Sequence, residues 1–325
     1  MTKILLICYT ILSVASLLPA QNSEVRIEID YDGNFMDTKF ISRDSLILIT
    51  GFQSTVSLLI NTNNNSVSAI DPRIDFPGFN FMAVETQFYD DRILYTNGGP
   101  WGFTISLDNK DVQELDRFFM APNDIVSVPN KDYFFGFHAR ESTLFPKPIL
   151  IKYNYNGISI DTTHYFDFRL PNILSSFDEF NLVHIDDTFI FTNPLDNELL
   201  LFNINGEYLR TIPLKFEGWN TVKSDIKTAG DSPSMFRNFN TSEATFIRKI
   251  YKLNNNNDVL IQYYSTSNRL YNYCILEGVC YTRKACFDGD VSNKIIGAIA
   301  NYLYYISYED DKTYLVGKHI SEFLD

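Results

Sequence analysis

The chain has 325 residues, of which 45% are hydrophobic and 15% aromatic, which is enough for a sizeable folded core. Its formal net charge of −13 argues against a nucleic-acid partner, because phosphate binding requires a basic surface. We therefore expect a globular protein with an acidic, water-exposed surface.

The first residues have the pattern of a secretory signal peptide. Lys3 precedes an apolar stretch that ends at Leu18, and the small residue Ala20 comes just before the sequence turns polar. An N-terminal membrane anchor is the alternative, and no later segment is suited to span a membrane. We expect residues 1–20 to be cleaved and the mature protein to reside in the periplasm, at the cell surface or outside the cell.

A turn residue followed by a strand-like run recurs six times along the rest of the chain. The six turn residues are Asp44, Asp91, Asp132, Asp187, Asp258 and Asn301. Their spacing brackets the roughly 40 to 50 residues of a four-stranded propeller blade with its loops. The runs are rich in β-branched and aromatic residues, which are typical of strands. The sequence therefore predicts an all-β fold, a six-bladed β-propeller that forms a single domain over residues 21–325.

The sixth run ends near Ile320, so the last blade lacks a fourth strand of its own. Residues 24–31, EVRIEIDY, alternate apolar and polar and precede the first blade. We predict that this N-terminal strand pairs with residues 313–320 and closes the ring. Closure would hide two sheet edges that otherwise invite aggregation.

The segment 187–213, DTFIFTNPLDNELLLFNINGEYLRTIP, resembles an NHL repeat. The matching positions are Asn197, Phe202, Asn203 and Gly206. Glu198 and Leu199 stand where the repeat usually has an arginine. About one blade matches closely, and the whole chain is similar to secreted bacterial six-bladed propellers with degenerate NHL-like blades. This resemblance implies a fold and export, but no reaction.

Strand direction alternates within a blade, so blade-to-blade connections share one face with the connections between second and third strands. The long segments of this face are residues 72–82, 98–102, 139–147, 167–178 and 217–245. Because long loops often carry function, we expect the ligand to bind on this loop-rich face. Residues 217–245 form an insertion between two blades, which is either a lid over the channel or a loop with no ligand role.

Two tryptophans and three arginines in these loops are the candidate ligand-binding residues. They are Trp101, Trp219, Arg73, Arg140 and Arg169. An exposed indole is a good platform for a sugar ring or a peptide side chain, although each Trp could instead pin its loop to the rim. The main expectation is a non-catalytic recognition module without a cofactor, with a glycan, a peptide or an envelope protein as its partner.

A divalent-cation-dependent hydrolase or lyase is the alternative function, and a scaffold in an envelope complex is the third. Gluconolactonase-like propellers hold a cation such as Ca²⁺ with carboxylate and amide oxygens at the channel mouth. Residues of these types at the beginnings of the predicted innermost strands are Glu85, Asn123, Asp124, Glu179 and Asn181, and Arg248 and Lys294 accompany them. No spacing motif supports this site.

The four histidines are expected at scattered positions around the ring. They are His138, His164, His184 and His319. A zinc-dependent lyase needs several histidines that converge in the channel, and a serine hydrolase needs a turn such as G-x-S-x-G, which the sequence lacks.

Three cysteines remain in the mature chain, in a compartment that permits disulfides. A three-residue hairpin loop with Gly278 in the left-handed conformation would place Cys274 opposite Cys280. We therefore expect a disulfide between Cys274 and Cys280, with buried thiols as the alternative. Cys286 has no evident partner.

Overall fold

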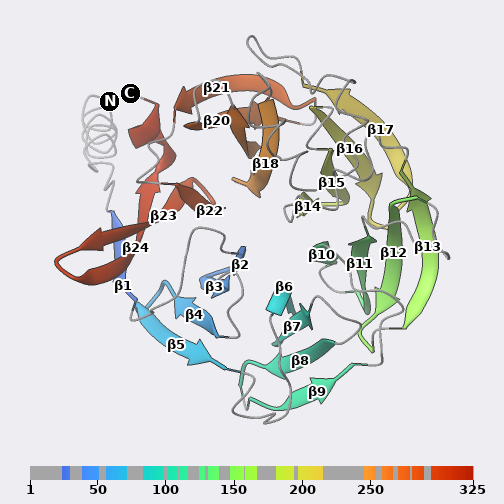
Figure 1. The fold of residues 1–325 in the computed structure, drawn as a ribbon, viewed down its shortest axis with the longest axis horizontal. Helices are drawn as coiled ribbons and strands as arrows, with labels where there is room; N and C mark the ends of the chain where they lie inside the picture. The colour runs from blue at the N-terminus through green and yellow to red at the C-terminus, as the bar shows by residue number, and fades with distance from the viewer. Residues whose placement is uncertain are drawn as a thin grey trace, which may run out of the picture.

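The computed structural model contains six four-stranded antiparallel sheets arranged around a central axis, as the sequence predicts (Figure 1). The structure describes residues 24–29, 39–50, 56–71, 83–97, 102–108, 110–115, 124–128, 131–138, 147–156, 158–166, 181–193, 197–214, 245–253, 258–265, 270–278, 280–288 and 294–324. The predicted signal peptide and the insertion, apart from residue 245, lie outside these ranges.

Each blade runs from an innermost to an outermost strand in chain order. Blade 1 contains β2 (Lys39–Arg43), β3 (Leu46–Thr50), β4 (Ser57–Asn61) and β5 (Ser66–Ile70). Blade 2 contains β6 (Ala83–Tyr89), β7 (Arg92–Asn97), β8 (Gly102–Ser106) and β9 (Val112–Glu114). Blade 3 contains β10 (Asp124–Ser127), β11 (Tyr133–His138), β12 (Ile149–Asn154) and β13 (Ser159–Tyr165).

The second half of the ring repeats this order. Blade 4 contains β14 (Asn181–Ile185), β15 (Thr188–Asn193), β16 (Glu198–Asn203) and β17 (Tyr208–Pro213). Blade 5 contains β18 (Thr245–Lys252), β19 (Val259–Ser265), β20 (Leu270–Glu277) and β21 (Thr282–Asp288). Blade 6 contains β22 (Ile295–Ile299), β23 (Tyr302–Glu309) and β24 (Lys312–His319), and a 3₁₀ helix, η4 (Ile320–Phe323), follows.

The fourth strand of blade 6 comes from the other end of the chain, as predicted. β1 (Val25–Glu28) pairs antiparallel with β24, and its register runs from Val25 opposite Gly317 to Glu28 opposite Tyr314. The apolar positions of EVRIEIDY face the core, where Ile27 is 3% and Ile29 is 1% exposed. The period-2 alternation of this segment therefore fixes both its secondary structure and its register.

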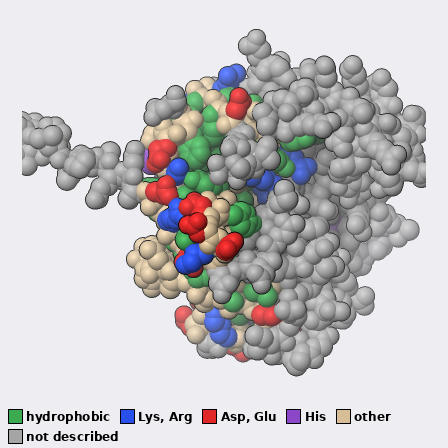
Figure 2. Space-filling model, turned by 60° about the vertical axis from the view of Figure 1, so that its left-hand side comes forward, with side chains coloured by type: hydrophobic (Ala, Val, Ile, Leu, Met, Phe, Trp, Pro, Cys, Tyr) green, Lys and Arg blue, Asp and Glu red, His purple; other side chains and the backbone are tan. Residues whose placement is uncertain are grey.

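Ion pairs join β1 to the β23–β24 hairpin on the solvent side. Arg26 donates to both carboxylate oxygens of Glu309, at 3.3 and 2.6 Å, and its guanidinium lies 4.0 Å from the ring centroid of Tyr314. Lys312 donates to Glu28 at 2.8 Å. The hydrogen bond from Arg26 lowers the pKa of Glu309. Figure 2 shows this side of the molecule, where acidic and basic side chains alternate.

Tight turns join the first and second strands of four blades. Asp44, Asp90, Asp186 and Ala300 occupy these turns with φ between 43° and 52°. Two-residue hairpins require such positive φ values, and Asp adopts them more readily than most residues. The recurring acidic turns of the sequence therefore mark the inner hairpins, while blades 3 and 5 use longer connections there, at residues 128–132 and 253–258.

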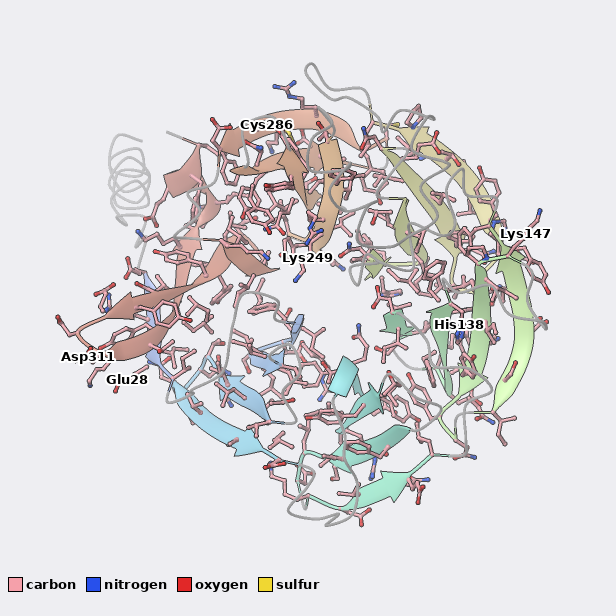
Figure 3. All side chains as sticks on the ribbon, in the orientation of Figure 1. Glu28, His138, Lys147, Lys249, Cys286 and Asp311 are labelled. Atoms are coloured by element: carbon pink, nitrogen blue, oxygen red, sulfur yellow. A yellow bond between two sulfur atoms is a disulfide. The ribbon has the colours of Figure 1, made fainter. Side chains whose placement is uncertain are left out.

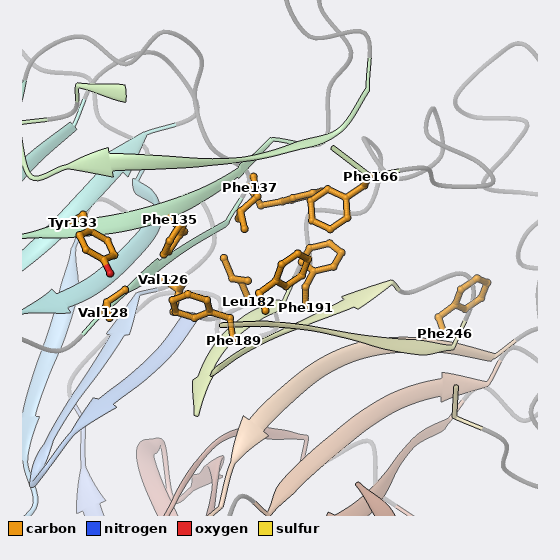
Figure 4. Packing of buried hydrophobic residues seen from close by; sticks show 12 residues of the cluster. Val126, Val128, Tyr133, Phe135, Phe137, Phe166, Leu182, Phe189, Phe191 and Phe246 are labelled. Carbon is orange, nitrogen blue, oxygen red and sulfur yellow. The ribbon is translucent and has the colours of Figure 1, made fainter. Parts of the chain in front are cut away.

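The cores lie between neighbouring blades, where apolar faces of two sheets meet. Between blades 3 and 4 the ring centroids of Phe137 and Phe191 are 4.6 Å apart, and those of Phe135 and Phe189 are 4.9 Å apart (Figure 4). All four side chains are fully buried. Because such clusters recur around the ring, strands such as LILIT are covered on both faces.

The predicted disulfide between Cys274 and Cys280 is wrong. The disulfide joins Cys274 to Cys286, which are opposed residues on β20 and β21, and Cys280 is an exposed free cysteine in the turn between these strands. The hairpin loop lies further along the chain than expected, because β20 continues to Glu277, which pairs with Thr282. A register shift between Ile275 and Leu276 then moves Cys286 opposite Cys274.

Candidate functional site

The beginnings of the innermost strands define one mouth of the central channel. β2, β6, β10, β14, β18 and β22 occupy this position and run in the same direction, because each follows the outermost strand of the preceding blade (Figure 1). The connections that enter this mouth include residues 71–82, 166–180 and 214–244. Most connections at the opposite mouth are tight turns, so the strand bounds agree with the predicted loop-rich face.

Side chains at this mouth bond several innermost strands to the backbone of the next. Gln87 on β6 donates to the carbonyl of Ile125 on β10 at 3.0 Å. Asn181 on β14 donates from its amide to the carbonyl of Arg248 on β18 at 2.7 Å. Innermost strands have no sheet neighbour on the channel side, so these bonds satisfy backbone groups that the sheets leave unpaired. They also fix the spacing of the blades around the channel.

Asp124 makes the corresponding contact between blades 3 and 4. Its side chain is 1% exposed, and its two carboxylate oxygens accept from the amide of Ile125 at 2.9 Å and from the amide of Leu182 at 2.7 Å. This bidentate use of the carboxylate stabilises the inter-blade boundary, since a buried charge needs hydrogen-bond donors.

The structure places only part of the predicted metal set. Asp124 and Asn181 lie on neighbouring innermost strands, and both contact backbone groups. Asn123 and Glu179 lie outside the described residues, and only the backbone of Glu85 is described. Within the described ranges, no three His, Cys, Asp or Glu side chains are arranged to hold a metal ion. The cation-dependent function therefore stays a prediction.

A second polar cluster lies between blades 5 and 6. Lys249 on β18 is directly opposite Gln262 on β19, so the two side chains point to the same face of the blade. The amide of Gln262, which is fully buried, donates to the carbonyl of Ile295 at 3.1 Å and to the hydroxyl of Tyr273 at 2.9 Å. Lys294 precedes Ile295 in the chain. Lys249 and Lys294 therefore belong to the same inter-blade boundary.

Burial acts on Tyr273 in this cluster. Its hydroxyl also accepts from the amide of Ile295 at 3.0 Å, and desolvation raises its pKa to about 12. Tyr273 thus remains a neutral hydroxyl at any physiological pH. It holds the start of β22 against blade 5 and keeps the positions of Lys294 and Gln262 fixed.

A β-bulge shapes the cationic part of this cluster. The register of β18 and β19 shifts between Ile247 and Lys249, which leaves Arg248 as the extra residue. Ile247 packs into the core between blades 4 and 5. Bulges re-aim side chains, and here two consecutive cations lie on one innermost strand. Figure 3 shows Lys249 on β18, directed towards the central opening.

Aromatic rings accompany the cations on the same side of blade 5. The ammonium group of Lys294 lies 4.7 Å from the ring centroid of Tyr271 at the beginning of β20. The ring of Tyr271 lies 5.4 Å from that of Tyr264 at the end of β19. A cation over an aromatic face is attracted by the ring quadrupole, so Tyr271 orients the Lys294 side chain.

The histidines lie at scattered positions, as expected. His138 ends β11, fully buried, and its Nε2 is 2.7 Å from the hydroxyl of Tyr153. His164 on the outermost strand β13 stacks on Tyr208 of β17, with ring centroids 5.6 Å apart. Burial lowers the pKa of His184 on β14, and Lys252 lowers it further.

The fourth histidine also makes a local contact. His319 Nδ1 is 2.8 Å from the hydroxyl oxygen of Ser321 in η4. The four histidines lie on four different strands, β11, β13, β14 and β24, and the contacts described above join each of them to nearby residues of its own or the adjacent blade. The described histidines therefore share no common site.

The predicted ligand-binding residues all fall in connections that the structure does not describe. They are Trp101, Trp219, Arg73, Arg140 and Arg169. Their predicted role stays a prediction. Sequence reasoning named Arg248 but missed Lys249 and Gln262, because neighbouring residues of a regular strand point to opposite faces. The bulge at Arg248 sets Lys249 opposite Gln262, and no sequence signal marks it.

Comparison with known proteins identifies a fold and no family. No family model matches the chain, and no curated protein matches it in sequence. A candidate exported protein from Bacteroides fragilis NCTC 9343 has a similar structure, with a TM-score of 0.62 and 9% sequence identity over 91% of this chain and 94% of that one.

A second solved structure is a member of the DUF4221 family from Bacteroides vulgatus. It has a TM-score of 0.60 and 8% identity, and the match covers 91% of this chain and 95% of that chain. At such identities the similarity establishes the shared propeller fold. In the part of the chain that the structure describes, no helix is long and apolar enough to cross a membrane.

Proposed function

We propose that the protein is an exported recognition module that binds a glycan at the loop-rich mouth of its channel. One observation carries the proposal. The long connections enter at the same mouth where innermost strands supply the cations Arg248 and Lys249 and where Lys294 enters β22. Ligand sites in ring-shaped folds form where such loops surround a rigid, polar opening.

Export is supported by two independent features. The N-terminal residues have the order of a cleavable signal, and one structurally similar protein is itself a candidate exported protein. In the segment of blade 4 that resembles an NHL repeat, Asn203 accepts from the amides of Asn205 and Glu207 and so stabilises the turn. We place the mature protein in the periplasm or at the cell surface.

A glycan suits this mouth better than an extended peptide. Peptides usually add a strand to a free sheet edge, where their backbone bonds with the edge strand. The innermost edges face one another around the channel, and register shifts interrupt β6, β18 and β22 near their beginnings. Sugar rings need only aromatic faces and a few polar groups, which Tyr264, Tyr271 and the neighbouring cations supply.

Tryptophan fluorescence of the mature protein, titrated with a panel of oligosaccharides, tests the proposal. We expect a saturable shift with at least one oligosaccharide, because Trp101 and Trp219 are predicted to flank the site. Trp101→Ala or Trp219→Ala should abolish it. Tyr208→Ala, which removes an aromatic ring 45% exposed on the outer side of blade 4, serves as the matched control and should leave binding unchanged. A panel without any binding oligosaccharide would refute the proposal.

A further inference from the structure

We infer that the channel mouth selects an anionic glycan, one whose sugar units carry carboxylate groups, and that Lys249 and Lys294 are the residues that recognise this charge. The inference rests on the proposed function and names the ligand class of the same site. It follows from the juxtaposition of two cations at one inter-blade boundary, from the sign of charge along the innermost strands and from the adjoining aromatic rings.

The backbone geometry brings the two lysines together. Lys249 shares a face of blade 5 with its cross-strand neighbour Gln262, and the amide of Gln262 reaches the carbonyl of Ile295 at 3.1 Å. Lys294 is the residue directly before Ile295. The hydroxyl of Tyr251, from the same strand as Lys249, also donates to the Ile295 carbonyl, at 3.2 Å. Two strands from neighbouring blades are thus held in a fixed relation, with one lysine on each.

The charge along the innermost strands has the opposite sign to the chain as a whole. The full chain has a net charge of −13. The six innermost strands contain five basic residues, Lys39, Arg43, Arg248, Lys249 and Lys252, and two acidic ones, Glu85 and Asp124. The carboxylate of Asp124 binds two backbone amides. Arg248 and Lys249 are both partly buried on β18. Basic side chains gathered at one end of the ring attract anions.

The ligand is also directed by the contrast between these local cations and the net charge of the whole chain, which is −13. Attraction of a polyanion then depends on Arg248, Lys249 and Lys294, so charge contributes specificity as well as affinity. Arg248 offers a planar group suited to bidentate contact with a carboxylate, whereas the lysines act as point charges.

The aromatic rings beside Lys294 favour sugars as the carriers of that charge. Tyr271 lies under the ammonium group of Lys294, and Tyr264 lies 5.4 Å from Tyr271. Carboxylate-bearing sugars have both an apolar ring face and a fixed negative group. Such a ligand can therefore contact the tyrosines and the lysines at once.

Isothermal titration calorimetry on the mature protein tests this inference with two probes of equal length. One is a short oligogalacturonate, and the other is the same oligosaccharide with every carboxylate methyl-esterified. We expect the acid to bind at least about 10-fold more tightly than the ester, because a charged hydrogen bond contributes more than a neutral one. The affinity for the acid should fall with rising salt concentration.

Single substitutions test which residues recognise the carboxylates. Lys249→Gln and Lys294→Gln should each weaken oligogalacturonate binding by about 10-fold and leave the affinity for the ester within about twofold. Lys252→Gln is the matched control, because Lys252 lies at the other end of β18 and pairs with Asp186 at 3.3 Å. It should leave both affinities unchanged. Thermal unfolding checks that each variant is folded, and the acid–ester comparison decides without any variant.

The outcomes separate this inference from the proposed function. Equal binding of acid and ester would overturn the inference and retain a glycan-binding module. A loss of affinity in Lys252→Gln as large as in Lys249→Gln and Lys294→Gln would also overturn it, because the affinity would then depend on the net charge of the protein and not on the two lysines. Tighter binding of a poly-glutamate peptide than of oligogalacturonate would replace the glycan by an acidic peptide. Absence of binding to every oligosaccharide would refute the proposed function itself.

Discussion

Replacement of Ile27 by alanine tests whether the N-terminal strand holds the ring closed. Ile27 is 3% exposed and lies directly opposite Leu315 of β24, within the core that joins blades 6 and 1. The substitution removes three carbon atoms, which costs about 2.4 kcal/mol in transfer free energy. The cavity left behind raises the expected loss in the free energy of unfolding to about 3–4 kcal/mol.

Urea-induced unfolding of the mature protein, followed by intrinsic fluorescence, measures this loss. Ile158→Ala is the matched control, since it makes the same chemical change at a side chain that is 51% exposed. The control should cost less than about 0.5 kcal/mol. A double-mutant cycle with Leu315→Ala should give a coupling energy of at least about 0.5 kcal/mol, because the two side chains are cross-strand neighbours.

Two results would refute this reasoning. The first is an Ile27→Ala protein that unfolds within about 0.5 kcal/mol of the Ile158→Ala protein. The second is additive behaviour of the Ile27 and Leu315 substitutions, which would mean that the strands do not pack together in solution. Either result would place the N-terminal strand outside the cooperative core.

Two further predictions concern single positions. Cys274→Ser combined with Cys286→Ser should lower the free energy of unfolding by about 3 kcal/mol, as expected for a cross-link that closes a loop of this length. Alkylation of the unfolded mature protein without reduction should modify one thiol, that of Cys280. Alkylation of Cys274 and Cys286 under these conditions would contradict the pairing. Gly206→Ala should cost about 2–4 kcal/mol in urea unfolding, because φ is +85° and an added Cβ would lie 2.7 Å from Phe135. Gly278→Ala, at φ +64° with no atom within 4 Å of the added Cβ, should cost only about 1 kcal/mol, and equal losses would refute the role of packing.

The fold could be predicted from the sequence because its signals are local. The tight acidic turns of blades 1, 2 and 4 specify inner hairpins, as Asp44 does with φ 52°. The alternation in residues 24–31 specifies one buried face, which only the unfilled edge of the last blade could cover. Both features depend on residues close together in the chain, so no knowledge of long-range contacts is needed.

The disulfide and the position of Lys249 depended on register, which the sequence does not show. A single extra residue in β21 moves Cys286 opposite Cys274, and a single extra residue in β18, Arg248, sets Lys249 opposite Gln262. β-bulges arise from the balance of packing on both faces of a sheet. Local propensity carries no sign of that balance, so the pairing of Cys286 and the position of Lys249 are evident only in the structure, whereas Arg248 and Lys294 are already candidates in the sequence.

The origin of blade 6 from both ends of the chain has a consequence for biogenesis. Val25 and Gly317 are partners in the sheet of blade 6, although about 290 residues separate them. The pairing of β1 with β24 therefore forms only when almost the whole polypeptide is available. Until then, the N-terminal strand has no partner for its backbone groups and is exposed to other chains. A chaperone that shields this strand would have a defined window in which to act, between the appearance of β1 and that of β24.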